Sequence, residues 1–134
     1  MTPLGIADTS LVVAYLNPRD QHHAWAVGQF ERFPWFVTCE PVLAEAAHLV
    51  GGPGPVVGLL VSGALRVGYA LDGDERAVAA LVSAYADVPM DLADACLVRM
   101  TEQTGRCEVV TADGDFFVYR RHRDQTIPVA HPNS

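Results

Sequence analysis

Short apolar segments alternate with helical patterns along this chain of 134 residues, and that alternation limits the folds open to it. We expect strands at residues 4–7, 35–39, 66–71, 108–111 and 126–130. We expect helices at residues 9–16, 21–33, 40–50, 55–64, 74–86 and 91–104. Strands that alternate with helices form a mostly parallel sheet, because the crossover helices cover both of its faces. The sequence therefore predicts one α/β domain over residues 1–134, with three α/β/α layers and a mostly parallel sheet of four to five strands.

Capping signals support several of these helix boundaries. Thr9 or Ser10 can cap the first helix, and Asp91 can cap the last one. Pro41 stands at a first helical position, where its missing N–H costs nothing. Gly105 follows the last expected helix and is a typical stop.

Composition indicates a folded protein of a reducing compartment. Half of the residues are hydrophobic and 19% are charged, which argues against disorder. The three cysteines are odd in number and lack paired spacing, which disfavours a disulfide framework or a zinc knuckle. The start of the chain has no basic segment typical of a signal peptide, and the longest apolar stretch, residues 56–65, is too short to span a bilayer. We expect a cytoplasmic protein without a membrane partner.

The charged residues exclude several classes of enzyme. All nine basic residues are arginines, so mechanisms that require a lysine are excluded, including the P-loop, Schiff-base chemistry and the usual aspartyl-phosphate enzymes. The net charge of −7 disfavours a nucleic-acid binder that works by overall attraction. Divalent cations bound among the acids would offset part of that charge.

Five acids lie where strands end or helices begin, or on the apolar face of a helix: Asp8, Glu45, Asp94, Asp113 and Asp115. Parallel sheets bind ligands at the carboxyl ends of their strands, so these side chains can converge at one edge. Clustered carboxylates raise one another's pKa unless cations neutralise them. Oxygen-loving ions such as Mg²⁺ or Mn²⁺ suit such a cluster. The pattern favours metal-dependent phosphodiester chemistry.

Each acid also has a purely structural interpretation. Asp8 can cap a helix, although Thr9 and Ser10 leave its carboxylate spare. Glu45 falls on the apolar face that holds Val42 and Leu49, so it is either a site residue or a glutamate at the edge of the stripe that turns to solvent. These two interpretations of Glu45 stay open.

The later acids need the same comparison. Asp91 and Asp94 have capping-box spacing, and we assign Asp91 mainly to the cap and Asp94 mainly to the site. A hairpin at Asp113-Gly114, returning through residues 116–119, competes with a site role. Asp115 would interrupt that second strand, and Thr111 is a natural hydroxyl partner for an acid cluster. The five histidines show no metal-ligand spacing, so we expect surface histidines.

The motifs that carry a family resemblance are Ile-Ala-Asp-Thr-Ser at 6–10, Pro-Val-Leu-Ala-Glu at 41–45, Met-Asp-Leu-Ala-Asp-Ala at 90–95 and Thr-Ala-Asp-Gly-Asp-Phe at 111–116. With these motifs the whole chain resembles PIN-domain ribonucleases, and within them the VapC toxins of toxin–antitoxin pairs. The resemblance implies a catalytic quartet of Asp8, Glu45, Asp94 and Asp113. It implies metal binding by Asp8, Asp94, Asp113 and the accessory Asp115, with Thr9, Ser10 and Thr111 as supporting hydroxyls.

The resemblance also implies an activity and partners. The activity would be Mg²⁺- or Mn²⁺-dependent endonucleolytic cleavage of RNA by a metal-activated water, inhibited by an antitoxin protein, and the chain would form a homodimer. The basic cluster at Arg120, Arg121 and Arg123 is either a solvated loop or a phosphate contact. One alternative is a PIN-like binding module without catalysis. Another is a phosphatase of the haloacid-dehalogenase type, which expects a lysine and an Asp-x-Asp pair that this chain lacks.

Overall fold

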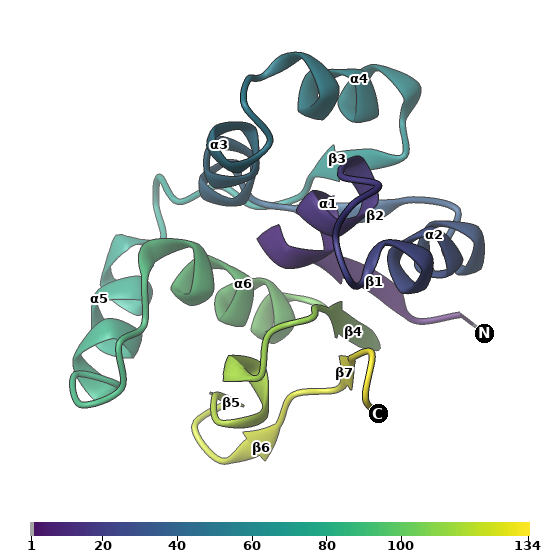
Figure 1. Cartoon of the computed structure of the whole chain (residues 1–134). Coiled ribbons are helices and arrows are strands. Elements are labelled where there is room, and N and C mark those ends of the chain that lie inside the picture. Colours follow the sequence, from purple (N-terminus) through teal and green to yellow (C-terminus); the bar gives the residue numbers. More distant parts are fainter. Residues whose placement is uncertain (1) are drawn as a thin grey trace.

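A five-stranded sheet forms the centre of the computed structural model, which describes residues 2–134 (Figure 1). Its strands are β1 (Leu4–Ala7), β2 (Phe36–Thr38), β3 (Leu65–Val67), β4 (Cys107–Val110) and β7 (Val129–Ala130). The strand order is β3-β2-β1-β4-β7, and every pairing in this sheet is parallel. The prediction of an α/β fold with a mostly parallel sheet is confirmed.

Six helices flank this sheet. They are α1 (Thr9–Leu16), α2 (His23–Arg32), α3 (Glu40–Leu49), α4 (Gly54–Ser62), α5 (Glu75–Ala84) and α6 (Leu92–Gln103). Helix α1 packs against α2 and α3, whereas α6 packs on β1 and β4 and contacts α5 (Figure 1). Within residues 2–134, no helix has both the length and the apolar character needed to cross a membrane.

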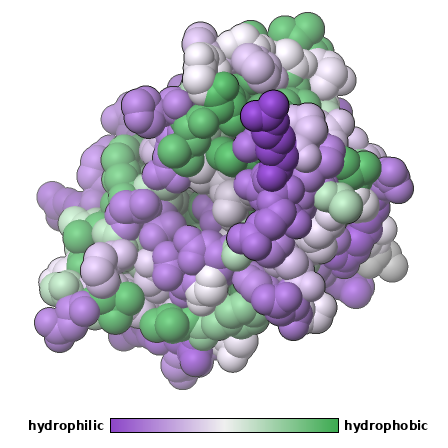
Figure 2. Space-filling view, in the orientation of Figure 1, coloured by the Kyte–Doolittle hydropathy of each residue, from purple (hydrophilic) through white to green (hydrophobic). Residues whose placement is uncertain are grey.

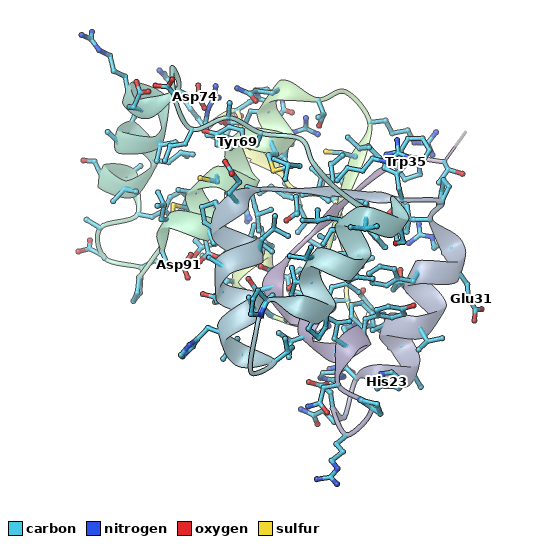
Figure 3. The ribbon with its side chains drawn as sticks, turned by 90° about the horizontal axis from the view of Figure 1, so that it is seen from above. His23, Glu31, Trp35, Tyr69, Asp74 and Asp91 are labelled. Atoms are coloured by element: carbon cyan, nitrogen blue, oxygen red, sulfur yellow. The ribbon has the colours of Figure 1, made fainter. Side chains whose placement is uncertain are left out.

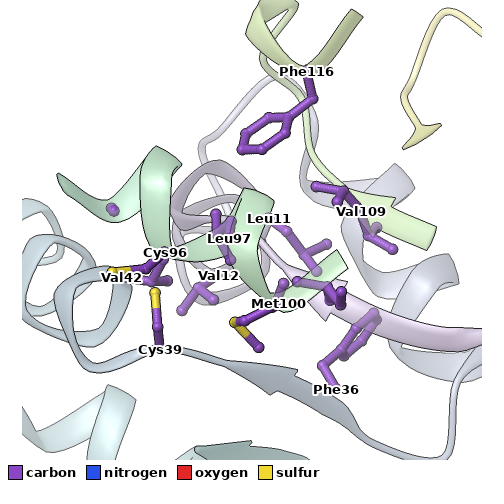
Figure 4. Packing of buried hydrophobic residues seen from close by; sticks show 14 of the residues in the cluster. Leu11, Val12, Phe36, Cys39, Val42, Cys96, Leu97, Met100, Val109 and Phe116 are labelled. Atoms are coloured by element: carbon purple, nitrogen blue, oxygen red, sulfur yellow. The ribbon is translucent and has the colours of Figure 1, made fainter. Parts of the chain in front are cut away.

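The hydrophobic core joins the central strands to α1, α3 and α6. Figure 4 shows Leu11 of α1, Leu97 of α6 and Phe36 of β2 in this cluster, and all three are fully buried. The three cysteines are buried free thiols, and Cys39 and Cys96 lie close to each other in the same picture. Because α6 contributes buried residues on most of its surface, its first turn is held firmly against the sheet.

Most helix boundaries follow the signals in the sequence. Helix α3 has proline in its first turn, and the Asp91 carboxylate accepts a hydrogen bond of 2.8 Å from the Asp94 N–H at the start of α6. The prediction that Thr9 or Ser10 caps α1 is wrong. The cap is Asp8, whose extended backbone lies just outside the helix and whose Oδ1 accepts the Thr9 N–H at 2.8 Å.

Two predicted strands are shorter than expected. The segment at 66–71 is a strand only to Val67. The segment at 126–130 divides in two, because Thr126 pairs with a different partner and Pro128 has no N–H to donate to a sheet. Only Val129–Ala130 joins the central sheet.

The segment after β4 does not form a hairpin at Asp113-Gly114. Asp115–Phe117 is instead a short 3₁₀ helix, η1. A small antiparallel hairpin follows, with β5 at Arg120–Arg121 and β6 at Gln125–Thr126. Its connecting turn places His122 and Arg123 at positive φ. The hairpin is anchored to the end of α6, where the Arg121 guanidinium donates to the carbonyl oxygens of Thr101 and Thr104.

A separate polar cluster joins α5 to α6. Asp74 precedes α5, and its carboxylate accepts hydrogen bonds from the Tyr69 hydroxyl at 2.6 Å and from two nitrogens of Arg99 at 2.8 and 2.9 Å. Figure 3 shows Tyr69 and Asp74 together, well apart from Asp91. Residues 72–74 are also where the sequence predicts the cap of this helix; Asp74 is the N-cap residue of α5, but its side chain makes no capping bond, because Arg99 and Tyr69 hold the carboxylate. The pairing lowers the pKa of Asp74.

Candidate active site

One cavity of about 530 Å³ collects acids from distant parts of the chain. The seven carboxylates that line it are Asp8, Asp20, Glu45, Asp91, Asp94, Asp113 and Asp115. Asp8 and Asp113 follow β1 and β4, neighbouring strands in the sheet, while Asp94 lies in the first turn of α6. All five acids singled out in the sequence therefore reach the same cavity, at the carboxyl edge of the sheet.

Asp8 is fixed by hydrogen bonds to both of its oxygens. Its Oδ1 accepts from the Thr9 N–H, and its Oδ2 accepts from the Thr111 hydroxyl at 2.7 Å. The Asp8 backbone N–H also donates to the Val110 carbonyl at 3.2 Å, which continues the pairing of β1 with β4. The carboxylate is 5% exposed, so its position is set by the backbone and by buried partners.

Thr111 and Ser10 link Asp8 to the loop that holds Asp113. The Thr111 hydroxyl accepts the Asp113 N–H at 2.9 Å while it donates to Asp8. The Ser10 hydroxyl lies 3.0 Å from the Thr111 hydroxyl and accepts the Ala112 N–H at 2.9 Å. Two of the three expected supporting hydroxyls, those of Ser10 and Thr111, thus hold the loop after β4 against the start of α1, whereas the Thr9 hydroxyl makes no such bond in the part of the chain that the structure describes.

Asp94 is held by a tyrosine that the sequence did not single out. The Tyr119 hydroxyl donates to Asp94 Oδ2 at 2.8 Å. Tyr119 is fully buried and packs edge-to-face against Phe116 and Tyr85. A tyrosine beside the basic cluster gives no sequence signal of this role, because the contact depends on how the segment after β4 folds back onto α6.

Burial of the two inner acids raises their pKa values well above that of a solvated aspartate. Desolvation raises the pKa of Asp94 to about 7, opposed by the Tyr119 hydrogen bond and assisted by the charges of Asp91 and Asp8. Desolvation likewise raises the pKa of Asp8 to about 6, opposed by hydrogen bonds from Thr111 and Thr9. The charges of Asp113 and Glu45 raise the pKa of Asp8 further. The acids therefore influence one another across the cavity.

The outer acids are more exposed. Glu45, Asp113 and Asp115 are exposed to solvent at the cavity rim. Desolvation and the neighbouring Asp113 charge raise the pKa of Asp115. The sequence left open whether Glu45 is a site residue or a glutamate at the edge of the apolar face that turns to solvent. In the structure it lines the cavity and is also exposed. Asp91 caps α6 as expected and also lines the cavity.

The donor set of the cavity fits a hard divalent cation that retains much of its water. Within residues 2–134, no three His, Cys, Asp or Glu side chains lie close enough together to bind one ion through three protein ligands. Mg²⁺ is commonly bound by only one or two carboxylates together with several waters, so it does not need three protein ligands. The Thr9 hydroxyl lines the cavity, is buried and has no hydrogen-bond partner in the described chain, so it can serve a water or another bound group.

The segment between α1 and α2 is the part of the cavity wall that the sequence did not indicate. Asp20, Gln21 and His22 all line the cavity. We expected surface histidines, but His22 faces this cavity and the His23 ring lies 2.8 Å from the Ala14 carbonyl oxygen. The turn at residues 17–22 brings these three residues to the cavity, and no spacing motif in the sequence reveals that turn.

The expected basic cluster lies away from the acids. The Arg120 guanidinium donates to the carbonyl oxygens of residues 117–119, and Arg121 to those at the end of α6. These contacts favour a structural role for both side chains. Arg123 is exposed and lines a different cavity, beside α5 and α6.

Comparison with known proteins identifies the fold. Neither a protein-family profile nor a curated protein sequence matches this chain. A solved structure does: VapC20 of Mycobacterium tuberculosis, described as a Sarcin–Ricin loop cleaving toxin, is 24% identical and superposes with a TM-score of 0.69. The similarity covers 83% of this chain and 91% of VapC20. The chain has a PIN-like fold. In this PIN-like fold, the cavity lies at the end of the sheet where parallel α/β proteins bind their ligands.

Proposed function

We propose that this chain is a VapC-type endoribonuclease that hydrolyses RNA phosphodiester bonds with Mg²⁺ or Mn²⁺ as cofactor. The observation that carries the proposal is the gathering of Asp8, Glu45, Asp94 and Asp113 around one cavity of a PIN-like fold. Two buried carboxylates with raised pKa values beside a cleft are typical of a functional site. Burying a carboxylate costs free energy, so a pair of buried carboxylates indicates a role beyond stability.

In this mechanism Asp8 and Asp94 would hold the cation, and Asp113, Asp115 and Glu45 would line the space around it. When bound, the cation supplies positive charge that stabilises the phosphate oxygens and makes a nearby water more acidic. Asp8 is an acceptor at both oxygens and keeps a fixed orientation. In Asp94, Oδ2 is engaged by Tyr119, so Oδ1 is the atom that we assign to the cation.

The proposed partners extend the resemblance to VapC toxins. We propose RNA as substrate, an antitoxin protein as inhibitor, a homodimer as the assembled form and the cytoplasm as location. Apolar side chains are exposed on this fold, including Leu49 at the cavity rim and Val57 and Val61 on α4. Figure 2 shows hydrophobic residues at the top of the molecule, where α4 lies.

A second candidate is a PIN-like binding module without catalysis. The observations that favour it are the net charge of −7 and the lack, within residues 2–134, of three converging ligands for one ion. The two candidates differ in one respect that can be measured: only the nuclease cleaves RNA in a way that depends on both a divalent cation and Asp94.

The test uses purified protein with total RNA and with a synthetic sarcin–ricin loop RNA, in Mg²⁺, in Mn²⁺ and in EDTA. We expect cleavage in either metal, none in EDTA, and a loss of at least about 100-fold in the Asp94→Asn variant, because loss of a ligand should cost at least as much as loss of a residue that supports one. Asp72→Asn is the matched control, because Asp72 is exposed and outside the cavity. Metal-stimulated cleavage by a correctly folded Asp94→Asn protein at the wild-type rate would refute the proposal.

A further inference from the structure

His22 is the one basic side chain in the wall of the acid cavity. Among the residues that the structure places there, seven are acids and none is an arginine. An RNA phosphate entering this space meets negative charge on almost every side. A cation at the inner acids offsets that charge locally, but the rest of the RNA backbone still needs hydrogen-bond donors from the protein.

The ring of His22 is free to meet a ligand. Over residues 2–134, its two ring nitrogens make no hydrogen bond to the protein, whereas the ring of the adjacent His23 is 2.8 Å from the Ala14 carbonyl oxygen. The His131 ring similarly lies 3.1 Å from the Ala112 carbonyl oxygen. Of the two adjacent histidines, one therefore holds α2 to α1, and the other faces the cavity.

The backbone fixes His22 at this place. Its N–H donates to Asp20 Oδ1 at 2.8 Å, and it forms the N-terminal boundary of α2, with no side-chain cap. Its ring meets the Trp25 ring edge-on, with 6.5 Å between centroids. The turn and the aromatic contact limit the positions open to the imidazole, so it forms part of a preorganised cavity wall.

Apart from the Thr9 hydroxyl, which has no partner among residues 2–134, the hydroxyl donors around the cavity are already engaged. The Thr111 hydroxyl donates to Asp8, and the Ser10 hydroxyl lies within reach of both Asp8 and Thr111. Gln21 and His22 are left as the side chains of the wall that can present an N–H. A neutral imidazole always carries one N–H, so His22 can donate a hydrogen bond without a change of charge.

We propose that His22 is a substrate contact that donates a hydrogen bond to a non-bridging oxygen of the RNA phosphodiester held in the acid cavity. The proposal rests on the proposed ribonuclease function. It assigns to His22 the task of positioning the RNA backbone, while the acids hold the cation. Loss of the imidazole then weakens RNA binding and leaves cation binding unchanged.

The test compares His22→Ala and His22→Gln with His48→Ala as matched control, since His48 is an exposed histidine outside the cavity. Binding of a fluorescein-labelled, mixed-sequence single-stranded RNA is measured by anisotropy in Ca²⁺. We expect His22→Ala to weaken the Kd roughly tenfold, the effect of one hydrogen bond to a charged group. His22→Gln retains an N–H donor and should recover part of that loss.

Two further measurements separate the possible roles of His22. In cleavage assays we expect His22→Ala to raise KM about as much as Kd, with kcat within about twofold of wild type. Titration calorimetry with Mn²⁺ alone should give the same affinity for both proteins. A loss of Mn²⁺ affinity in His22→Ala would instead make His22 a metal ligand and overturn the assignment.

The outcomes also distinguish this proposal from the nuclease proposal. If the wild type cleaves RNA and His22→Ala binds RNA as tightly as the wild type, the His22 assignment alone is refuted. If the wild type binds RNA without cleaving it and His22→Ala weakens binding, the His22 contact stands and the nuclease assignment fails. A wild type that neither binds nor cleaves RNA refutes both.

Discussion

The Tyr119 hydroxyl donates a hydrogen bond of 2.8 Å to Oδ2 of Asp94, so the acid at the start of α6 is held by a residue twenty-five positions further along the chain. The bond favours the ionised carboxylate and opposes the effect of burial on the Asp94 pKa. Tyr119 is itself locked by Phe116 and Tyr85. The aromatic cluster therefore helps to orient this acid, and its hydrogen bond lowers a pKa that burial raises.

Replacing Tyr119 with phenylalanine should raise the Asp94 pKa above its present value of about 7, because the ring stays packed while the hydroxyl is lost. At pH 7 a larger share of Asp94 would be protonated, so Mn²⁺ should bind more weakly, and the difference should shrink at pH 9. Calorimetric Mn²⁺ titrations at the two pH values measure this. Tyr15→Phe is the control, since Tyr15 stacks on Phe30 away from the acids. Equal Mn²⁺ affinity of Tyr119→Phe and wild type at pH 7 would contradict the assignment.

The inner acids should make the metal-free protein less stable as pH rises. The pKa values of Asp8 and Asp94, about 6 and about 7, lie above the usual aspartate pKa of 3.8. The folded state therefore holds extra protons, and the stability that they provide below pH 3.8 is lost as pH rises through about 6 to 7. From pH 5 to pH 8 we expect the two acids to lower the free energy of unfolding by about 2 to 4 kcal/mol.

Urea unfolding in EDTA at pH 5 and pH 8 checks this dependence. The five histidines titrate in the same range, so the informative quantity is the difference between wild type and Asp94→Asn. The variant should lose less stability over this interval and should be the more stable protein at pH 8. Identical pH dependence of the two proteins would show that Asp94 titrates normally in the folded state.

Thr111 should be important both for the stability of the protein and for the order of the loop that carries Asp113. Its hydroxyl donates to Asp8 and accepts from the Asp113 N–H, so Thr111→Val removes both bonds and leaves buried polar groups without partners. We expect a loss of about 2 to 3 kcal/mol in the free energy of unfolding. Faster hydrogen exchange at the Asp113 amide should accompany it, while Thr111→Ser, which keeps the hydroxyl, should remain near wild type in both measurements.

Two glycines should respond to alanine in opposite directions. At Gly5, in β1, a Cβ would lie 2.8 Å from ring atoms of both Phe33 and Phe36, in a fully packed region. Gly5→Ala should therefore cost about 1 to 3 kcal/mol. At Gly28, in α2, a Cβ meets nothing within 4 Å, so alanine should stabilise the helix by about 0.5 to 1 kcal/mol. Chemical unfolding of the two variants measures both effects, and a neutral Gly5→Ala would mean that Phe33 and Phe36 can move aside.

The fold could be predicted where local pattern and tertiary structure agree. The segments predicted as strands at 4–7 and 108–111 are short, mostly apolar and closely followed by an aspartate, and the corresponding strands β1 and β4 lie next to each other in the sheet. The five acids could be located because strand ends and helix starts in a parallel sheet share one edge.

The remaining features depend on contacts between distant residues. His22 reaches the cavity through the turn after α1, and Tyr119 reaches Asp94 through the irregular segment after η1. The β5–β6 hairpin forms where Arg121 binds the last carbonyls of α6, a contact that no local propensity encodes. The cap of α1 was harder to predict, because the single carboxylate of Asp8 both caps this helix and lines the cavity.

The pairing of Ala7 with Val110 has a consequence for ion binding. Asp8 is the next residue after one of these strands, and Asp113 follows the other by a loop that Thr111 anchors. Repulsion between Asp8 and Asp113 is therefore not relieved by fraying of an edge strand, because both acids follow inner strands of the sheet. Under the proposed function, the cost of bringing these two charges together is met during folding, so a divalent cation would find them already positioned.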